Sequence, residues 1–321
     1  MKKIQISVLS LLILAGLFLV PAGARSQTLE EAGAAYNSAA ELIKTDLPGA
    51  IMQFKNCIAI AEKLGDEGNE LKANASAQIP GLYYNHAVAL QSGGNLDEAI
   101  QACTDAMKAA DEYSNPEIKE KAKNLASQIF LVKGNGSLKA KDMDNALTHF
   151  DKALEFDPGL TRAYYGKLMV YREKELYPEM EAAFAKMKEV SSADEDIVSK
   201  TQVVISKTYS VAAAKSIKAG KASLALEYSD KAIGYGDSSA NTFYYQALAA
   251  NMEKKWDIAL EAAQKALDLE QKDKNKIYFE IGKAWEGKGN SAEACAAYKN
   301  VAAGPYVQNA QYQMKQVLKC K

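Results

Sequence analysis

The residue types that could do catalytic or metal chemistry are sparse in this chain. Only two of its 321 residues are histidines, His86 and His149. Neither has a second histidine or a cysteine at the spacing that a metal site needs, and a general base also needs partners that converge on one substrate. We therefore interpret both as helix-packing or surface residues, and the sequence predicts no enzyme activity, no metal and no cofactor.

A glycine-containing stretch, Lys133 to Ser137, has the letters KGNGS and invites comparison with a phosphate-binding loop. Such a loop needs a Gly-Lys-Ser/Thr ending and a strand before it, and both are missing here. A glycine also allows two helices to approach closely, because it has no Cβ. We therefore expect Gly134 to lie at a helix crossing.

The composition favours helices as the elements that position these residues. Hydrophobic residues make up 48% of the chain and charged residues 25%, which is enough to bury a core. Alanine is abundant and there are only 7 prolines, a composition that suits helices. Few stretches are dense in valine, isoleucine and threonine, so we predict an all-α fold without a sheet.

The segment from 127 to 160 shows the pattern most clearly. It predicts two short helices folded back on each other, with small residues where they touch: Gly134 in the first, Ala146 and Ala153 in the second. Phe150 lies on the same helical face as these alanines. Pro158 ends the second helix, since proline cannot continue it.

This pattern resembles the tetratricopeptide repeat (TPR), a 34-residue helix–turn–helix unit. The aromatic residue common in the first helix is replaced by Ser137. The resemblance implies a right-handed α-solenoid of about seven units in a domain over 27–321, with extra residues extending some first helices. Asn115 with Pro116, and residues 192–194, are predicted starts of two extended helices. Pro80 is expected to kink or split the first helix of the second unit. The expected units are 31–64, 80–113, 127–160, 161–194, 206–239, 240–273 and 275–308, followed by a capping helix over 306–320.

The N-terminus has the features of a secretory signal peptide over 1–26. Two lysines follow Met1, residues 4–20 carry no charge, and small residues at 21–24 suit cleavage after Ala24 or Ser26. The alternative is an uncleaved membrane anchor. The first interpretation predicts a periplasmic or secreted bacterial protein without a membrane span after cleavage. The net charge of −1 and the lack of a basic cluster argue against a nucleic-acid partner.

The four cysteines divide into two groups. Cys57 and Cys103 fall at core positions of the repeat, where cysteine acts as a small apolar residue. Cys295 lies on the last second helix and Cys320 at the end of the cap, so the two could meet. An exported protein encounters oxidants, and we leave open whether this pair is bridged or free.

The resemblance also implies that the first helices line a concave groove for a partner. Aromatic residues recur there beside cations and amides, a combination that suits peptides or glycans. The alternative is that the rings pack neighbouring units. The aromatic residues also stand where the family's carboxylate clamp would have its lysine, so the resemblance does not extend to that clamp. The candidate residues are Tyr84, Asn135, Arg162, Tyr165, Arg172, Lys207, Asn241, Tyr244, Asn251, Lys276 and Phe279.

Together these features predict a non-catalytic scaffold or adaptor of the bacterial cell envelope that binds a protein or peptide partner. The alternative is an accessory protein that binds glycans or peptides for nutrient capture. The two differ in their surfaces: a scaffold should have a long, mixed groove, whereas a glycan site should gather aromatic and carboxylate side chains in one pocket.

Overall fold

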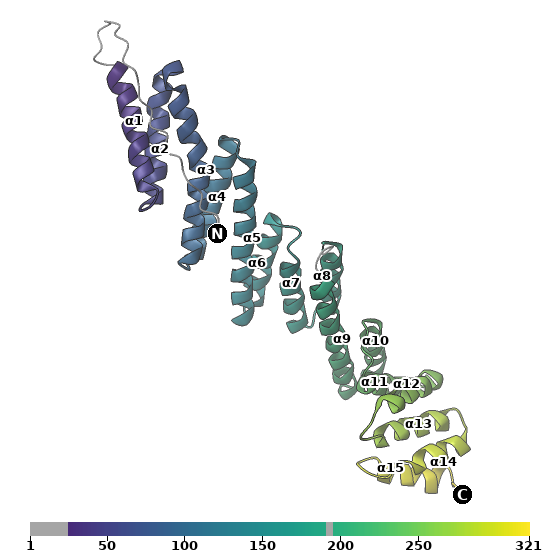
Figure 1. Ribbon diagram of the computed structural model, residues 1–321. Coiled ribbons are helices and arrows are strands. Elements are labelled where there is room, and N and C mark those ends of the chain that lie inside the picture. The colour runs from purple at the N-terminus through teal and green to yellow at the C-terminus, as the bar shows by residue number, and fades with distance from the viewer. Residues whose placement is uncertain (1–24, 191–194) are drawn as a thin grey trace. The chain divides into compact units, whose positions relative to one another are not determined.

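The computed structural model describes residues 25–190 and 195–321, and these residues form helices without any strand (Figure 1). The predicted all-α helical-repeat fold is thereby confirmed. Residues 1–24, which hold most of the predicted signal peptide, and residues 191–194 lie outside the described part. The helices are α1 (Arg25–Leu42), α2 (Leu47–Lys63), α3 (Asn69–Ser92), α4 (Leu96–Glu112), α5 (Pro116–Lys139), α6 (Met143–Phe156), α7 (Thr161–Glu173), α8 (Tyr177–Val190), α9 (Glu195–Lys218), α10 (Ala222–Gly234), α11 (Ala240–Met252), α12 (Trp256–Leu269), α13 (Asn275–Gly287), α14 (Ser291–Lys299) and α15 (Val307–Tyr312), with a 3₁₀ turn at Gly65–Gly68 and a π-helical turn at Gln313–Val317.

The helices are grouped in two compact units that divide after Pro158. In the first unit, α1, α3 and α5 each pack against the helix that follows. In the second unit, α7, α9, α11 and α13 do the same, and α15 lies after the last pair. This gives seven helix–turn–helix pairs within the described residues.

Local sequence explains where several helices begin. Asn115 caps α5 by accepting a hydrogen bond from the Ile118 N–H at 3.1 Å, and Pro116 takes the first helical position, where its missing N–H costs nothing. Asp142 caps α6 in the same way through the Asn145 N–H at 3.2 Å. Lys141 turns the chain between the two helices with a positive φ of 62°.

Three first helices are longer than the others. The helices α3, α5 and α9 each have 24 residues, whereas α7, α11 and α13 each have 13. Pro80, which is expected to kink or split α3, is buried inside one continuous helix. The expected split is therefore wrong, and the kink stays a prediction. The predicted start of α9 at 192–194 falls outside the described residues.

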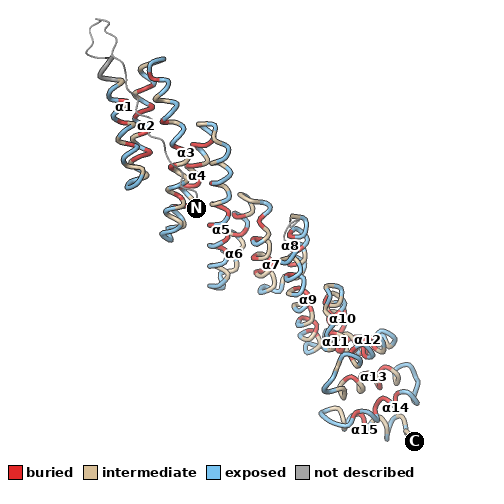
Figure 2. Tube along the Cα trace, viewed as in Figure 1, coloured by how far each residue is buried: buried red, intermediate tan, exposed pale blue. Residues whose placement is uncertain are grey.

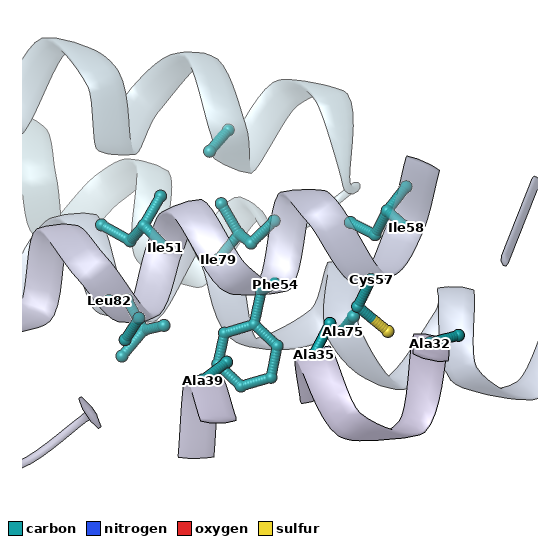
Figure 3. Packing of buried hydrophobic residues seen from close by; sticks show 12 residues of the cluster. Ala32, Ala35, Ala39, Ile51, Phe54, Cys57, Ile58, Ala75, Ile79 and Leu82 are labelled. Carbon is teal, nitrogen blue, oxygen red and sulfur yellow. The ribbon is translucent and has the colours of Figure 1, made fainter. Parts of the chain in front are cut away.

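The core of the first pair shows how small residues bring helices together. Phe54 of α2 lies beside Ala35 and Ala39 of α1, and Ile79 of α3 completes the contact (Figure 3). The Phe54 ring also meets the Tyr36 ring edge to face, with centroids 5.2 Å apart. Buried positions lie inside the helix pairs and exposed ones along their outer sides (Figure 2).

Two glycines of first helices lie directly beneath a buried aromatic ring of the second helix in the same pair. A Cβ built on Gly134 of α5 would stand 2.5 Å from Phe150 Cε1 in α6, and one on Gly282 of α13 would stand 2.6 Å from Tyr298 Cδ1 in α14. Both rings are fully buried. The expected close approach at Gly134 is therefore confirmed, and the phosphate-loop interpretation has no further support.

The C-terminal segment is tied to the last pair at several points. Cys295 of α14 and Cys320 form a disulfide with Cα atoms 5.8 Å apart, whereas Cys57 and Cys103 are free and buried. The Asn275 side-chain oxygen accepts hydrogen bonds from the N–H groups of Ala302 and Ala303 at 2.8 and 3.0 Å. These ties fix the path of residues 300–321 over α13 and α14.

Candidate functional site

The described residues were compared with the requirements of a metal site and of a membrane-spanning helix. No group of three or more histidine, cysteine, aspartate or glutamate side chains in this part of the chain is placed to hold a metal ion. Within the same residues, no helix combines the length and the apolar character that crossing a bilayer requires.

A cavity with a volume of about 850 Å³ runs along α9. Its walls come from α9, from the connection between α10 and α11, and from the start of α11. We call it the α9 groove, and its lining residues are Val203, Ser206, Lys207, Ser210, Val211, Ala214, Lys215, Lys218, Tyr235, Gly236, Asp237, Ser238, Ser239, Asn241 and Tyr245.

The charges in the α9 groove are predominantly positive. Lys207 and Lys218 are exposed and have no ion-pair partner among the described residues, whereas Lys215 pairs with Glu175 at 2.6 Å. The one carboxylate, Asp237, is engaged by the Thr242 hydroxyl at 2.9 Å. An extended segment with acidic side chains would therefore meet two lysines that are not already neutralised.

Apolar surface lies beside these cations. Val203 is 47% exposed and Val211 is 56% exposed, both unusually high for large aliphatic side chains on a helix that otherwise buries its apolar residues. Val203 and Val211 lie four residues before and after Lys207, about one helical turn away on either side. A partner that covers them gains from burying apolar area, at about 25 cal/mol per Å².

A second, smaller hollow of about 390 Å³ continues from the other side of α9. It shares Lys207, Val211 and Lys215 with the α9 groove and adds Arg172 at the end of α7. The Arg172 guanidinium pairs with its neighbour Glu173 at 2.6 Å. Of the candidate residues, the structure thus brings Arg172, Lys207 and Asn241 to one continuous surface around α9.

Tyr244 and Asn251 of α11 are both buried, whereas the repeat pattern predicts that they line an open groove. Tyr244 is 7% exposed, and its hydroxyl lies 3.3 Å from the Tyr306 hydroxyl of the C-terminal segment. Burial, followed by this hydrogen bond, raises the pKa of Tyr244. For these two residues, packing within the second unit has replaced the open groove position that the repeat pattern predicts.

The Lys276 ammonium is held above the same ring. It lies 4.7 Å from the Tyr244 ring centroid and donates to the Asn241 side-chain oxygen at 3.0 Å. Phe279 packs between Tyr298 and Tyr306, with ring centroids 5.6 and 5.1 Å away. The predicted stripe of rings at this end of the array therefore serves mainly to seat the C-terminal segment.

The remaining candidate residues have separate surroundings. Arg162 is exposed at the start of α7, and Tyr165 is half-buried against the aromatic core shared by α7, α8 and α9. Tyr84 is half-buried on α3 and Asn135 is exposed on α5, both in the first unit. The partner-binding role of these four stays a prediction.

Several residues of the α9 groove are absent from the sequence-based set. Ser210, Ala214 and Lys218 follow Lys207 at steps of three or four residues, so they share its helical face. That periodicity was readable in the sequence. Val203 was harder to find, because it lies in the extension of α9 beyond the 34-residue pattern, where the resemblance assigns no role.

Comparison with known proteins yields structural matches only. No protein-family model matches the chain, and no curated protein matches it. Similar solved structures include YrrB, described as a TPR protein with an unusual peptide-binding site, at 20% identity over 62% of this chain and 96% of that one, with a TM-score of 0.37. Another is a tetratricopeptide repeat protein from Parabacteroides merdae, at 15% identity over 92% and 100%, with a TM-score of 0.28.

The TPR2AB domain of yeast Sti1 in its complex with pHSP90 is also similar. The identity is 15% over 89% of this chain and 95% of that one, with a TM-score of 0.30. At these TM-scores none of the three carries an argument about this chain. The helical-repeat fold is established by the seven helix pairs themselves.

Proposed function

We propose that this protein is a non-catalytic scaffold of the bacterial cell envelope, and that it binds an acidic, extended segment of a protein partner in the α9 groove. The observation that carries the proposal is the groove itself: a concave surface on which two lysines without an ion-pair partner among the described residues alternate with two exposed valines. A solenoid of helix pairs suits this task, because its stacked first helices form an extended binding surface.

The envelope location is supported by the N-terminal sequence. A basic start, an uncharged run over residues 4–20 and small residues after it are typical of an exported chain. N-terminal sequencing of the protein from the periplasmic or secreted fraction should give a chain that begins between Arg25 and Gln27. Recovery of intact Met1 in the membrane fraction would contradict this part of the proposal.

The binding role can be tested by site-specific photo-crosslinking in the native host. A photoreactive side chain at Val211 lies in the α9 groove, whereas one at Ile258 is similarly exposed on α12 but lies outside it. We expect a discrete protein adduct from position 211 and none from position 258. Equal labelling at both positions would show only non-specific collision.

Charge reversal supplies the second arm of the test. The double variant Lys207→Glu/Lys218→Glu should abolish the adduct at position 211, because it places carboxylates where the partner's acidic residues would lie. The matched control is Lys254→Glu/Lys272→Glu, which changes the net charge equally at exposed residues outside the groove. If the adduct at position 211 still forms in the Lys207→Glu/Lys218→Glu variant, the proposal that the bound segment is acidic is wrong.

A further inference from the structure

A separate cavity lies near the C-terminal end of the second unit, and its lining differs from that of the α9 groove. It has a volume of about 460 Å³, within the range of about 300–1,000 Å³ that is usual for small-molecule sites. Its walls come from α11, α12, α13 and the C-terminal segment. We call it the α13 pocket, and the residues that matter are Asn251, Trp256, Phe279, Glu286, Tyr312 and Gln313.

Two of the residues that line this pocket carry a buried side-chain oxygen with no hydrogen-bond partner among the described residues: Asn251 Oδ1 and Gln313 Oε1. Asn251 is only 5% exposed, and its amide nitrogen is held by Glu280, at 2.9 Å from the backbone oxygen and 2.7 Å from the carboxylate. That arrangement leaves the Asn251 oxygen as the free end. A buried polar atom without a partner costs about 1–3 kcal/mol, so a ligand that donates hydrogen bonds there is favoured.

The charged groups around the α13 pocket already have partners. The Lys283 ammonium pairs with the buried Glu280 carboxylate at 3.2 Å. The Glu286 carboxylate accepts a hydrogen bond from the Tyr298 hydroxyl at 2.8 Å. The Lys283 charge is therefore offset by Glu280, whereas the Glu286 carboxylate, bonded only to a neutral hydroxyl, keeps its negative charge. This disfavours an anionic ligand, and the hydroxyl groups of a neutral sugar could also donate to this carboxylate.

Aromatic side chains form part of the pocket wall. Trp256 and Phe279 line it, and Tyr312, which is 59% exposed, stands at its rim. The Trp256 ring fits closely over Gly287, where an added Cβ would lie 2.5 Å from Trp256 Cε2. Flat rings of this kind accept the C–H face of a sugar ring, while the two orphan oxygens accept its hydroxyl groups.

We infer that the α13 pocket binds a neutral pyranose sugar, either free or at the end of a glycan. The inference goes beyond the proposed protein partner, because it concerns a different cavity and a different ligand chemistry. The hydroxyl groups of the sugar would donate to Asn251 Oδ1 and Gln313 Oε1, and its ring would lie against the aromatic wall. A compact pocket with three aromatic residues and a carboxylate is also what a glycan site should show.

The test uses the full purified chain and a panel of methyl α- and β-pyranosides of glucose, galactose and mannose. Saturation-transfer NMR identifies binders, and calorimetry measures their affinity. We expect at least one neutral pyranoside to bind saturably. Gln313→Met removes an orphan acceptor and Tyr312→Ala removes the rim ring, and each should weaken binding roughly ten-fold, which is the scale of one hydrogen bond or one ring contact.

Matched controls come from the same segment. Gln316→Met and Val317→Ala change exposed neighbours that do not line the pocket, and both should bind like the parent. Glucuronate and glucosamine test for charged ligands, and N-acetylserine methylamide tests for a peptide backbone. The inference is overturned if no neutral pyranoside binds, if all variants bind equally, or if only a charged or peptide probe binds.

Discussion

The third helix pair (α5 and α6) and the seventh (α13 and α14) both place a glycine of the first helix beneath a buried ring of the second. They differ in how much helix supports that contact. The third pair has helices of 24 and 14 residues, whereas the seventh has helices of 13 and 9. The same crossing is thus built once on long helices and once on short ones.

The seventh pair has additional ties that the third pair lacks. Its ring carries a hydroxyl that is bonded to Glu286, its second helix is joined to the C-terminal segment by the Cys295–Cys320 disulfide, and Asn275 holds that segment by two hydrogen bonds. Most helical stability in proteins comes from tertiary packing. Where short helices limit that packing, covalent and polar ties take over part of the task.

The largest expected effect follows from removing the covalent tie. Closing a loop of 25 residues stabilises a fold by about 3 kcal/mol in the chain-entropy description, so Cys320→Ser should lose about that much in the seventh pair. Hydrogen exchange should show faster exchange of the α13 and α14 amides. The α5 and α6 amides serve as the internal control, and unchanged protection of α14 would contradict the role assigned to the disulfide.

The glycine crossings are the next strongest test. Gly134→Ala and Gly282→Ala each force a Cβ into a ring that cannot move away, which should cost about 1–3 kcal/mol. Gly136→Ala is the matched control on α5, because nothing lies within 4 Å of its Cβ position. It should gain about 0.5–1 kcal/mol through helix propensity. Urea unfolding of the three variants measures the contrast, and a stable Gly134→Ala protein would refute the close approach.

Alanines at the helix crossings should resist added bulk in the same way. Ala146 of α6 and Ala259 of α12 are buried, so leucine at either position should overpack the crossing by about 1–3 kcal/mol. Thermal melts of the two variants against the parent measure the loss. A melt of Ala146→Leu that matches the parent would contradict the repeat alignment used here.

The smallest effect concerns pH and the third pair. Burial, and then the nearby Lys133 and Lys152, lower the pKa of His149 despite Asp97 and Asp142. The unfolded chain takes up a proton near pH 6.5, whereas the folded state takes it up only at a lower pH, so stability should fall as the pH drops from about 6.5 toward the lower folded pKa. We expect under about 1 kcal/mol, absent in His149→Gln. Amides of the seventh pair, which contains no histidine, should show no such dependence, and an equal loss there would assign the effect elsewhere.

Much of the fold was predictable, because the repeat pattern marks helix crossings with small residues. Gly134, Ala146 and Ala153 identified one crossing, and Asn115 with Pro116 identified a helix start. The continuity of α3 through Pro80 was not predictable from propensity, because burial of the proline within the packed pair outweighs the hydrogen bond that it removes.

The candidate sites were harder to predict than the fold. Repeat positions say which face of a helix a residue lies on, and two of the candidate residues, Lys207 and Asn241, line the α9 groove. Their role in binding stays a prediction. Repeat positions do not say what covers that face. Tyr306 contacts both Tyr244 and Phe279, and it lies in the segment after α14, which follows no periodic pattern. Non-repetitive segments therefore limit what a repeat alignment can tell about a binding surface.

The two hydrogen bonds from Ala302 and Ala303 to Asn275 have a kinetic consequence. Elsewhere, the helices of each unit pack mainly against the next in sequence, and contacts of this local kind form in microseconds to milliseconds. The Asn275 bonds instead close a loop of 27 to 28 residues onto a helix start. Because longer loops pay more entropy before their contacts form, we expect this segment to dock after α13 and α14 have paired, as the last step in the folding of its end of the chain.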